Sequence, residues 1–145
     1  MSNEELIKLA IEARECAYAP YSHWKVGAAL LTTDGKVYKG CNVENSGFTA
    51  TSCAERTAFF KAVSEGVYNF EKIAVVGGDE KLGITGICTP CGVCRQVMAE
   101  FCDPDKFRVI SAKSPTDYID YSLREMLPEV GFVVDSNSYG YKGGE

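Results

Sequence analysis

Apolar residues recur at two spacings along this chain, one typical of helices and one typical of strands. After Ser2 they recur every three or four residues, and Ser2 with Glu5 fits a capping box, so a helix is predicted that ends at Pro20. Residues 26–32 and 36–41 are rich in strand-forming types and are separated by Asp34-Gly35, which predicts a hairpin. The N-terminal part of the chain therefore predicts one helix followed by an antiparallel pair of strands.

Helical and strand patterns alternate through the rest of the chain. A second helix is predicted over about 53–65, with Ser52 as its N-cap, and a third begins after Pro90. Strands are predicted at 72–76, 107–112 and 118–121, and a short helix at 122–127. This alternation predicts a layered α/β domain, and the hairpin makes its sheet of about five strands mixed.

Length and composition narrow the class of protein. The chain has 145 residues, 46% of them hydrophobic and 24% charged, which is typical of one globular domain over 1–145. Its end, at about 136–145, is Gly-rich and is expected to be a flexible tail. A net charge of −5 argues against a nucleic-acid partner, and no pattern of a secretory signal or a membrane span is found. We therefore expect a cytoplasmic protein.

Seven cysteines make an odd count for a disulfide framework, and cysteine clusters in a reducing compartment point to metal binding or catalysis. Three of them lie in the stretch ICTPCGVCRQ. Pro90 restricts Thr89 to a non-helical conformation, so Cys88 is assigned to the incoming loop, without a role in metal binding. Cys91 and Cys94 follow at the start of the next helix, where the helix dipole is expected to lower their pKa values.

A further cysteine at a predicted helix start extends the candidate metal site. Cys53 in SCAER, with Cys91 and Cys94, supplies three thiolates, and three protein ligands with a fourth position open are typical of catalytic zinc. Glu55, on the first turn of the same helix as Cys53, is positioned to carry a proton. Arg56 is expected to donate hydrogen bonds to thiolate sulfurs and to offset their negative charge.

Several segments carry a resemblance to a known family. The combination of C-x-E with P-C-x-x-C is the cysteine variant of the signature of the zinc nucleobase deaminases. The chain resembles the small homotetrameric cytidine deaminases in APYSHWKVGAALL, GCNVEN, CAERTAFFKAVSEG and PCGVCRQV, from the first helix to about Pro128. This resemblance implies a three-layer domain, in which a mixed sheet carries helices on both faces.

The resemblance also implies a reaction, the hydrolytic deamination of cytidine and 2′-deoxycytidine to uridine and 2′-deoxyuridine with release of ammonia, in pyrimidine salvage. One Zn²⁺ per subunit is implied, held by Cys53, Cys91 and Cys94. Zinc-activated hydroxide is expected to attack C4 of the base, with Glu55 as the proton shuttle. The implied partners are a small-molecule nucleoside and other copies of the chain, in a homotetramer with sites at subunit interfaces.

Substrate contacts are implied by the same motifs. Asn42 and Glu44 of GCNVEN are implied to bind the ribose 3′-hydroxyl, and both can point to one side of an extended stretch. The Ala54 N–H is implied to contact the pyrimidine O2, and the Thr89 carbonyl the exocyclic amine. Trp24 stands where the family usually has the phenylalanine that lines the pyrimidine pocket.

Two further aromatic residues are assigned to substrate binding, and both depart from the family pattern. Phe48 stands where many relatives carry tyrosine, so a hydroxyl contact is absent there. Phe132 is the candidate for an aromatic residue that reaches into a neighbouring subunit's site, although its spacing from Leu127-Pro128 is longer than usual.

Two other functions are alternatives. A blasticidin S-type or other small-molecule aminohydrolase shares the zinc motifs, but it lacks the CNVEN motif, so Asn42 and Glu44 favour a nucleoside. A noncatalytic zinc or redox protein is the other alternative, because C-x-x-C near a helix start is also a redox pattern. Redox chemistry gives no role to Glu55, which argues against it. The only histidine, His23, is expected in an exposed loop rather than as a metal ligand.

Overall fold

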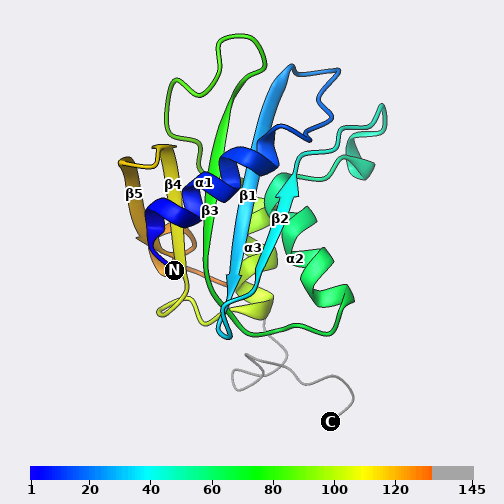
Figure 1. Cartoon of the computed structure of the whole chain (residues 1–145). Coiled ribbons are helices and arrows are strands. Elements are labelled where there is room, and N and C mark those ends of the chain that lie inside the picture. The colour runs from blue at the N-terminus through cyan, green and yellow to red at the C-terminus, as the bar shows by residue number, and fades with distance from the viewer. Residues whose placement is uncertain (132–145) are drawn as a thin grey trace.

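The computed structural model describes residues 1–131, and Figure 1 shows how their helices and strands are arranged. Phe132 and the expected tail at 136–145 lie outside the described residues. In chain order the elements are α1 (Asn3–Arg14), β1 (Trp24–Thr32), β2 (Val37–Cys41), the 3₁₀ turn η1 (Phe48–Ala50), α2 (Ala54–Ser64), β3 (Phe70–Asp79), α3 (Gly92–Phe101), β4 (Arg108–Ser114), β5 (Asp117–Ser122) and α4 (Leu123–Met126).

The five strands form one mixed sheet in the order β2-β1-β3-β4-β5. β3 and β4 are parallel, with Ala74 opposite Ile110, while the other neighbouring pairs are antiparallel. α1 crosses one face of the sheet, and α2 and α3 lie behind it on the opposite face (Figure 1). The predicted hairpin, the mixed sheet and the placement of helices on both faces are therefore confirmed.

Two apolar clusters hold these three layers together, one on each face of the sheet. Under α1, Leu6 and Ile7 pack with Ala74 of β3. On the opposite face, Phe59 of α2 and Met98 of α3 are fully buried. Burying one large apolar side chain contributes about 1.5–3 kcal/mol, so this second cluster fixes α2 and α3 side by side and sets where their N-termini lie.

The first helix confirms the predicted N-terminal capping box but ends earlier than predicted. Ser2 Oγ accepts from the Glu5 N–H, and the Glu5 carboxylate accepts from the Ser2 N–H in return. The helix ends at Arg14 rather than continuing to Pro20, because Tyr18 pairs with another part of the chain. The Tyr18 N–H donates to the Asn42 carbonyl at 2.9 Å, and the Glu44 N–H donates to the Tyr18 carbonyl at 2.9 Å.

The second helix, and its N-cap, lie one residue later than predicted. Ser52 was expected as the N-cap, but Cys53 occupies that position and makes no side-chain capping bond. Ser52 is extended, since its N–H and carbonyl both bond to Val43 at 2.9 Å. The Cys53 side chain therefore stands at the helix N-terminus without a capping role.

Glycine brings α2 close to the sheet. A Cβ atom at Gly40 of β2 would lie 2.4 Å from the Ala54 carbonyl oxygen and 2.6 Å from the Ala58 nitrogen. Only a residue without a side chain allows this approach, so the first turn of α2 rests on the backbone of β2. Among residues 1–131, no helix has the combined length and apolar character that crossing a bilayer requires.

Candidate metal centre and substrate cavity

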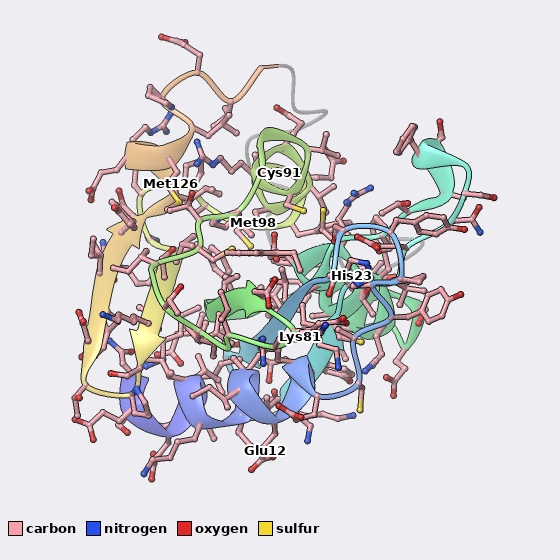
Figure 2. All side chains as sticks on the ribbon, turned by 90° about the horizontal axis from the view of Figure 1, so that it is seen from above. Glu12, His23, Lys81, Cys91, Met98 and Met126 are labelled. Atoms are coloured by element: carbon pink, nitrogen blue, oxygen red, sulfur yellow. The ribbon has the colours of Figure 1, made fainter. Side chains whose placement is uncertain are left out.

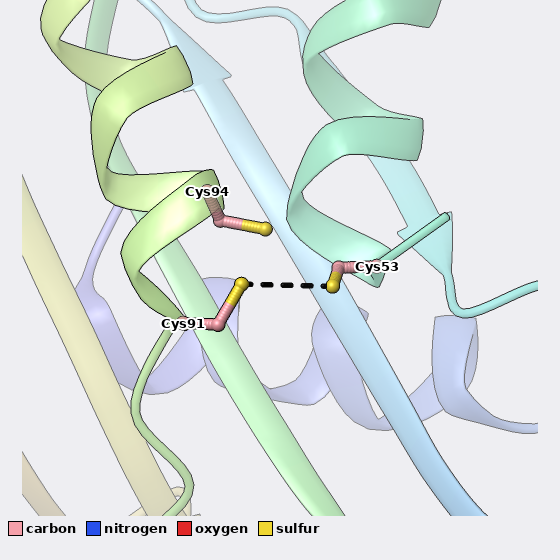
Figure 3. Close-up of side chains that lie close together, drawn as sticks. All are labelled: Cys53, Cys91 and Cys94. Carbon is pink, nitrogen blue, oxygen red and sulfur yellow. Dashed lines mark hydrogen bonds between the residues drawn. The ribbon is translucent and has the colours of Figure 1, made fainter. Parts of the chain in front are cut away.

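Three cysteine sulfurs gather where the N-termini of α2 and α3 meet (Figure 3). Cys53 is the N-cap of α2, Cys91 is the N-cap of α3, and Cys94 lies in the first turn of α3. The three Sγ atoms lie within 4.8 Å of one another, and those of Cys53 and Cys91 are 3.8 Å apart. Tetrahedral zinc with Zn–S bonds of about 2.3 Å places sulfurs about 3.8 Å apart, so this donor set fits a zinc ion.

This cluster lies on the sheet face opposite α1. In Figure 2, seen from above, Cys91 and Met98 of α3 lie on one side of the sheet and Glu12 of α1 on the other. Each helix N-terminus presents unpaired backbone N–H groups and the positive end of the helix dipole. Two such termini at one point stabilise thiolates and favour an anionic ligand beside them. Among the residues described, no other group of three His, Cys, Asp or Glu side chains fits a metal ion.

The protonation of the cluster differs from the sequence expectation at Cys94. The pKa of Cys53 is lowered to about 5, first because Cys94 hydrogen-bonds to it and further because Arg56 does. The pKa of Cys94 is raised rather than lowered, because its thiol shares its proton with Cys53 and because it is buried. The helix dipole was expected to lower the pKa of Cys94, but the neighbouring sulfur of Cys53 and burial act in the opposite direction and outweigh it.

Arg56 is the cation closest to the sulfurs. Its Nη2 donates to Cys53 Sγ at 3.2 Å and lies 3.5 Å from the Thr51 carbonyl oxygen. The bond to Cys53 is the main cause of a raised pKa for Arg56, with a bond to Cys94 contributing as well. The guanidinium therefore stays charged and offsets part of the negative charge that three thiolates bring.

Glu55 lies in the first turn of α2, beside the cluster. Only 4% of its surface is exposed. Its pKa is raised to about 7, first by burial and then by the negative charge of Cys53, while a hydrogen bond with Cys94 acts in the opposite direction. A carboxyl group with a pKa near neutrality can both accept and release a proton, which is what general acid–base catalysis requires.

A cavity of about 310 Å³ opens beside the sulfurs. It brings together six residues that the sequence assigned to catalysis or substrate binding, namely Trp24, Asn42, Glu44, Ala54, Glu55 and Thr89. Cys53 and Cys91 also line it, so the candidate metal position and the candidate substrate position share one space. A larger cavity, of about 440 Å³, lies elsewhere, along Phe70 and Phe107, and contains none of these residues.

Asn42 and Glu44 are held firmly by neighbouring backbone. Asn42 Oδ1 accepts from the Val26 N–H at 2.9 Å, and its Nδ2 donates to the Trp24 carbonyl at 2.8 Å. The Glu44 carboxylate accepts from the backbone N–H of Tyr21 and from the N–H and hydroxyl of Ser22, at 2.6–3.1 Å. Each group keeps further hydrogen-bonding capacity, so both can receive a hydroxyl-rich ligand without reorganising.

Other predicted residues are not gathered at this cavity. Phe48 is 91% exposed in η1 and does not line it. An Asx turn, in which Asn45 Oδ1 accepts from the Gly47 N–H at 2.9 Å, directs this loop away from the sheet. His23 is exposed, with its Nδ1 3.1 Å from the Glu80 carboxylate, and it lies outside the sulfur cluster, as expected.

The sequence reasoning missed five residues that line the cavity, namely Ser22, Val26, Thr51, Ser52 and Cys88. Val26 was detectable, since it follows Trp24 by two positions in a strand and therefore shares its face. Ser22 acts through its bonds to Glu44, which only the fold reveals. Cys88 was correctly kept out of the metal cluster, but its assignment to a loop without a role was incomplete, because it lies in the cavity wall.

Known proteins are similar to this chain in sequence and in fold. The family model described as "Cytidine and deoxycytidylate deaminase zinc-binding region" matches residues 1–110. A cytidine deaminase from Sporosarcina psychrophila is 57% identical over 103 residues, which is 71% of this chain and 72% of the relative. A cytidine deaminase from Halalkalibacterium halodurans is 47% identical over 137 residues, which is 94% of this chain and 99% of the relative. The crystal structure of a cytidine deaminase from Burkholderia pseudomallei superposes with a TM-score of 0.81, at 46% identity, over 90% of this chain and 100% of that chain.

A blasticidin-S deaminase is more distant. The protein of that name from Bacillus cereus is 30% identical over 127 residues, which is 86% of this chain and 88% of the relative. Its similarity accords with the shared zinc motifs. Because the family model covers most of the sequence and the nearer relatives align along most of their own lengths, this chain belongs to the cytidine and deoxycytidylate deaminase family.

Proposed function

We propose that this chain hydrolyses cytidine and 2′-deoxycytidine to uridine and 2′-deoxyuridine, with release of ammonia. One observation carries the proposal, namely that the buried carboxyl of Glu55 lies beside three clustered thiols in the same cavity as Asn42 and Glu44. The names of the similar proteins from Halalkalibacterium halodurans and Burkholderia pseudomallei support it.

Cys53, Cys91 and Cys94 are the proposed zinc ligands. When bound, zinc supplies a Lewis acid that lowers the pKa of a water molecule toward about 7. Arg56 keeps Cys53 ionised and reduces the net negative charge around it. The three sulfurs come from two helix N-termini rather than from one loop, so their relative position depends on the packing of α2 against α3.

Glu55 is the proposed proton carrier. Its carboxylate takes one proton from the attacking water and passes it to N3, and then takes the second proton from the hydroxyl on C4 and passes it to the amine. The C–N bond to the amine breaks, ammonia leaves, and the oxygen of water stays on C4, so that water plus cytidine gives uridine plus ammonia. A pKa of about 7 suits Glu55 to both halves of this transfer.

The substrate is oriented by groups at both ends of the cavity. Asn42 and Glu44 are proposed to bind the ribose, at a point where the strands supply rigid support. The Ala54 N–H, at the first position of α2, has no partner within the helix and is proposed to bind O2 of the base. The Thr89 carbonyl is proposed to accept from the amine.

A direct assay tests the proposal. The zinc-loaded protein is expected to deplete the near-ultraviolet absorbance of cytidine and deoxycytidine, and blasticidin S is assayed in parallel. Turnover of blasticidin S alone would favour the small-molecule aminohydrolase instead. If protein with bound zinc consumes neither the nucleosides nor blasticidin S, the proposal fails, and a noncatalytic zinc or redox function takes its place.

We also propose that the chain acts in the cytoplasm as a homotetramer with sites at subunit interfaces, and that residues 1–145 form one domain. The exposure of Phe48, 91% in a single chain, supports an interface next to the cavity, because its turn leads directly to Thr51 in the cavity wall. Light scattering on the purified protein tests this assembly, and a monomeric mass in an active preparation would refute it.

A further inference from the structure

We infer that Cys88 is a specificity-determining residue, which, with Trp24 and Gly77, forms a wall that fits the unsubstituted C5 edge of the pyrimidine ring. This inference rests on the proposed nucleoside deamination and goes beyond it. It assigns a role to a thiol that is outside the metal cluster and is not needed for the transfer of protons.

The wall begins with two adjacent strands. β1 pairs with β3 so that Val26 stands opposite Gly77. Trp24 and Val26 are two apart on β1 and share a face, and Val26 packs against the cluster under α2 and α3. The position that a side chain of residue 77 would occupy is therefore on the same side of the sheet as Trp24 and Val26, toward the substrate cavity.

Cys88 and Trp24 fill the space above Gly77. A Cβ atom on Gly77 would lie 2.8 Å from Cys88 Sγ and 3.1 Å from Trp24 Nε1. A larger residue at position 77 would displace both side chains. Glycine at this position therefore allows the thiol and the indole to occupy the same part of the cavity wall. Both side chains also line the cavity.

The two side chains lie beside each other in the cavity wall. Burial and, next, the charge of Glu55 raise the pKa of Cys88, while the Trp24 side chain acts in the opposite direction. Cys88 is therefore a neutral thiol next to the indole. An indole that is 44% exposed has freedom to turn in the cavity mouth unless such a contact holds it.

The position of Cys88 in the chain indicates which edge of the base it faces. Thr89, the next residue, is the proposed acceptor for the exocyclic amine at C4. Ala54 and Glu55 are proposed to contact O2 and N3, so they occupy the opposite edge of the ring. The neighbour of the amine on the remaining side is C5, and a substituent there meets the wall of Cys88 and Trp24.

The experiment compares 5-methylcytidine with cytidine as substrates. The wild-type chain is expected to prefer cytidine in kcat/KM, because a methyl group that a rigid pocket excludes changes specificity by about 10–200-fold. Cys88→Ala and Trp24→Phe are each expected to raise the ratio of kcat/KM for 5-methylcytidine over cytidine by about tenfold or more. Because the two residues act through one contact, their effects on this ratio should not multiply. The fold-change in the double variant should be close to that of the stronger single variant and well below the product of the two single fold-changes.

Tryptophan fluorescence tests the contact without any substrate. Trp24 is the only tryptophan in the chain, and a thiol in contact with an indole quenches its emission. Cys88→Val is expected to brighten Trp24, whereas the matched control Cys16→Ser, an exposed cysteine outside the cavity, is expected to leave the emission unchanged. Zinc content and thermal unfolding identify any variant that has lost its fold.

The outcomes separate the wall from the reaction. Unchanged emission in Cys88→Val overturns the contact. Changed emission with an unchanged substrate ratio in folded, zinc-loaded Cys88→Ala and Trp24→Phe overturns the specificity role. If Cys88→Val increases the emission of Trp24 but the wild-type chain does not deaminate cytidine, the proposed function is refuted, while the contact between the two side chains is supported.

Discussion

Each face of the sheet buries an apolar core, but the charged groups on the two faces are used in different ways. On the α1 face, Arg14 is only 7% exposed, and its guanidinium donates to three backbone carbonyls, those of Lys25, Gly78 and Asp79, at 2.8–3.1 Å. These acceptors belong to the two interior strands β1 and β3. Arg14 therefore connects α1 to β1 and to the end of β3, and its guanidinium serves a structural role.

On the opposite face, the charged groups beside the sulfurs contact groups that can change state. Arg56 donates to a cysteine sulfur, and Glu55 is buried next to the sulfurs. Burial raises the pKa of Glu55 to about 7, whereas the pKa of Glu44 is lowered, first by the hydrogen bond from the Ser22 hydroxyl and then by those from the N–H groups of Ser22 and Tyr21. A buried charge whose acceptors are all backbone carbonyls, as at Arg14, therefore supports the fold, while a charged group beside titratable or metal-binding groups is available for chemistry.

Replacement of a sulfur ligand should have the largest effect, because it removes the metal. In Cys91→Ser, zinc is expected to fall from about one equivalent per chain to near zero after dialysis, and deamination with it. Cys91 is exposed at the N-cap of α3 and makes no capping bond, so the fold should survive. Elemental analysis measures the metal, and Cys88→Ser serves as the control that retains it. Loss of zinc in the control would show that the wrong pair was assigned.

Glu55→Gln should separate metal binding from turnover. The amide keeps the size of the side chain but cannot carry a proton, so kcat is expected to fall by about 10²–10⁴-fold with zinc content unchanged. Stability should not fall, since a neutral amide is easier to bury than a carboxylate. Steady-state kinetics and metal analysis on one preparation check both parts. Turnover close to the wild-type rate would remove Glu55 from its proposed role.

Much of this arrangement was predictable because local signals agreed with the tertiary structure. The capping box at Ser2, the Asp34-Gly35 turn and the alternation of helices and strands lead to the observed elements. Pro90 marks where α3 begins and correctly separates Cys88 from the sulfur cluster. Local chemistry was sufficient in these cases because no distant part of the chain competes for the same backbone groups.

Prediction failed where a distant segment competes. Residues near Tyr18 have helical character but pair with Asn42 and Glu44, and Ser52 is extended by its bonds to Val43 instead of capping α2. The raised pKa of Cys94 depends on a sulfur from another helix. The role of Cys88 depends on the bare surface of Gly77, which pairing of β1 with β3 brings beneath it. None of these neighbours is visible in local sequence.

Arg14→Met tests the structural half of the comparison. Methionine retains apolar length but leaves the carbonyls of Gly78 and Asp79 without their buried donor, so the free energy of unfolding should fall by about 2–4 kcal/mol. Zinc content should be unchanged, because Arg14 lies on the other face. Urea unfolding measures the stability. If Arg14→Met lowered the zinc affinity as much as Arg56→Met does, the two faces of the sheet would not be independent.

Arg56→Met tests the other half and should give the smallest change. Removal of the donor to Cys53 leaves three thiolates with less compensation, and loss of such a partner typically lowers metal affinity or activity by about 10–100-fold. Arg56 is partly exposed and, unlike Arg14, does not donate to backbone carbonyls of the sheet. The free energy of unfolding of the zinc-free chain should therefore change less than in Arg14→Met. Competition with a chromogenic chelator measures the zinc affinity. Arg56→Lys keeps the charge but not the planar donor, so recovery of affinity in that variant would assign the effect to charge, and its absence would assign it to the directed hydrogen bond.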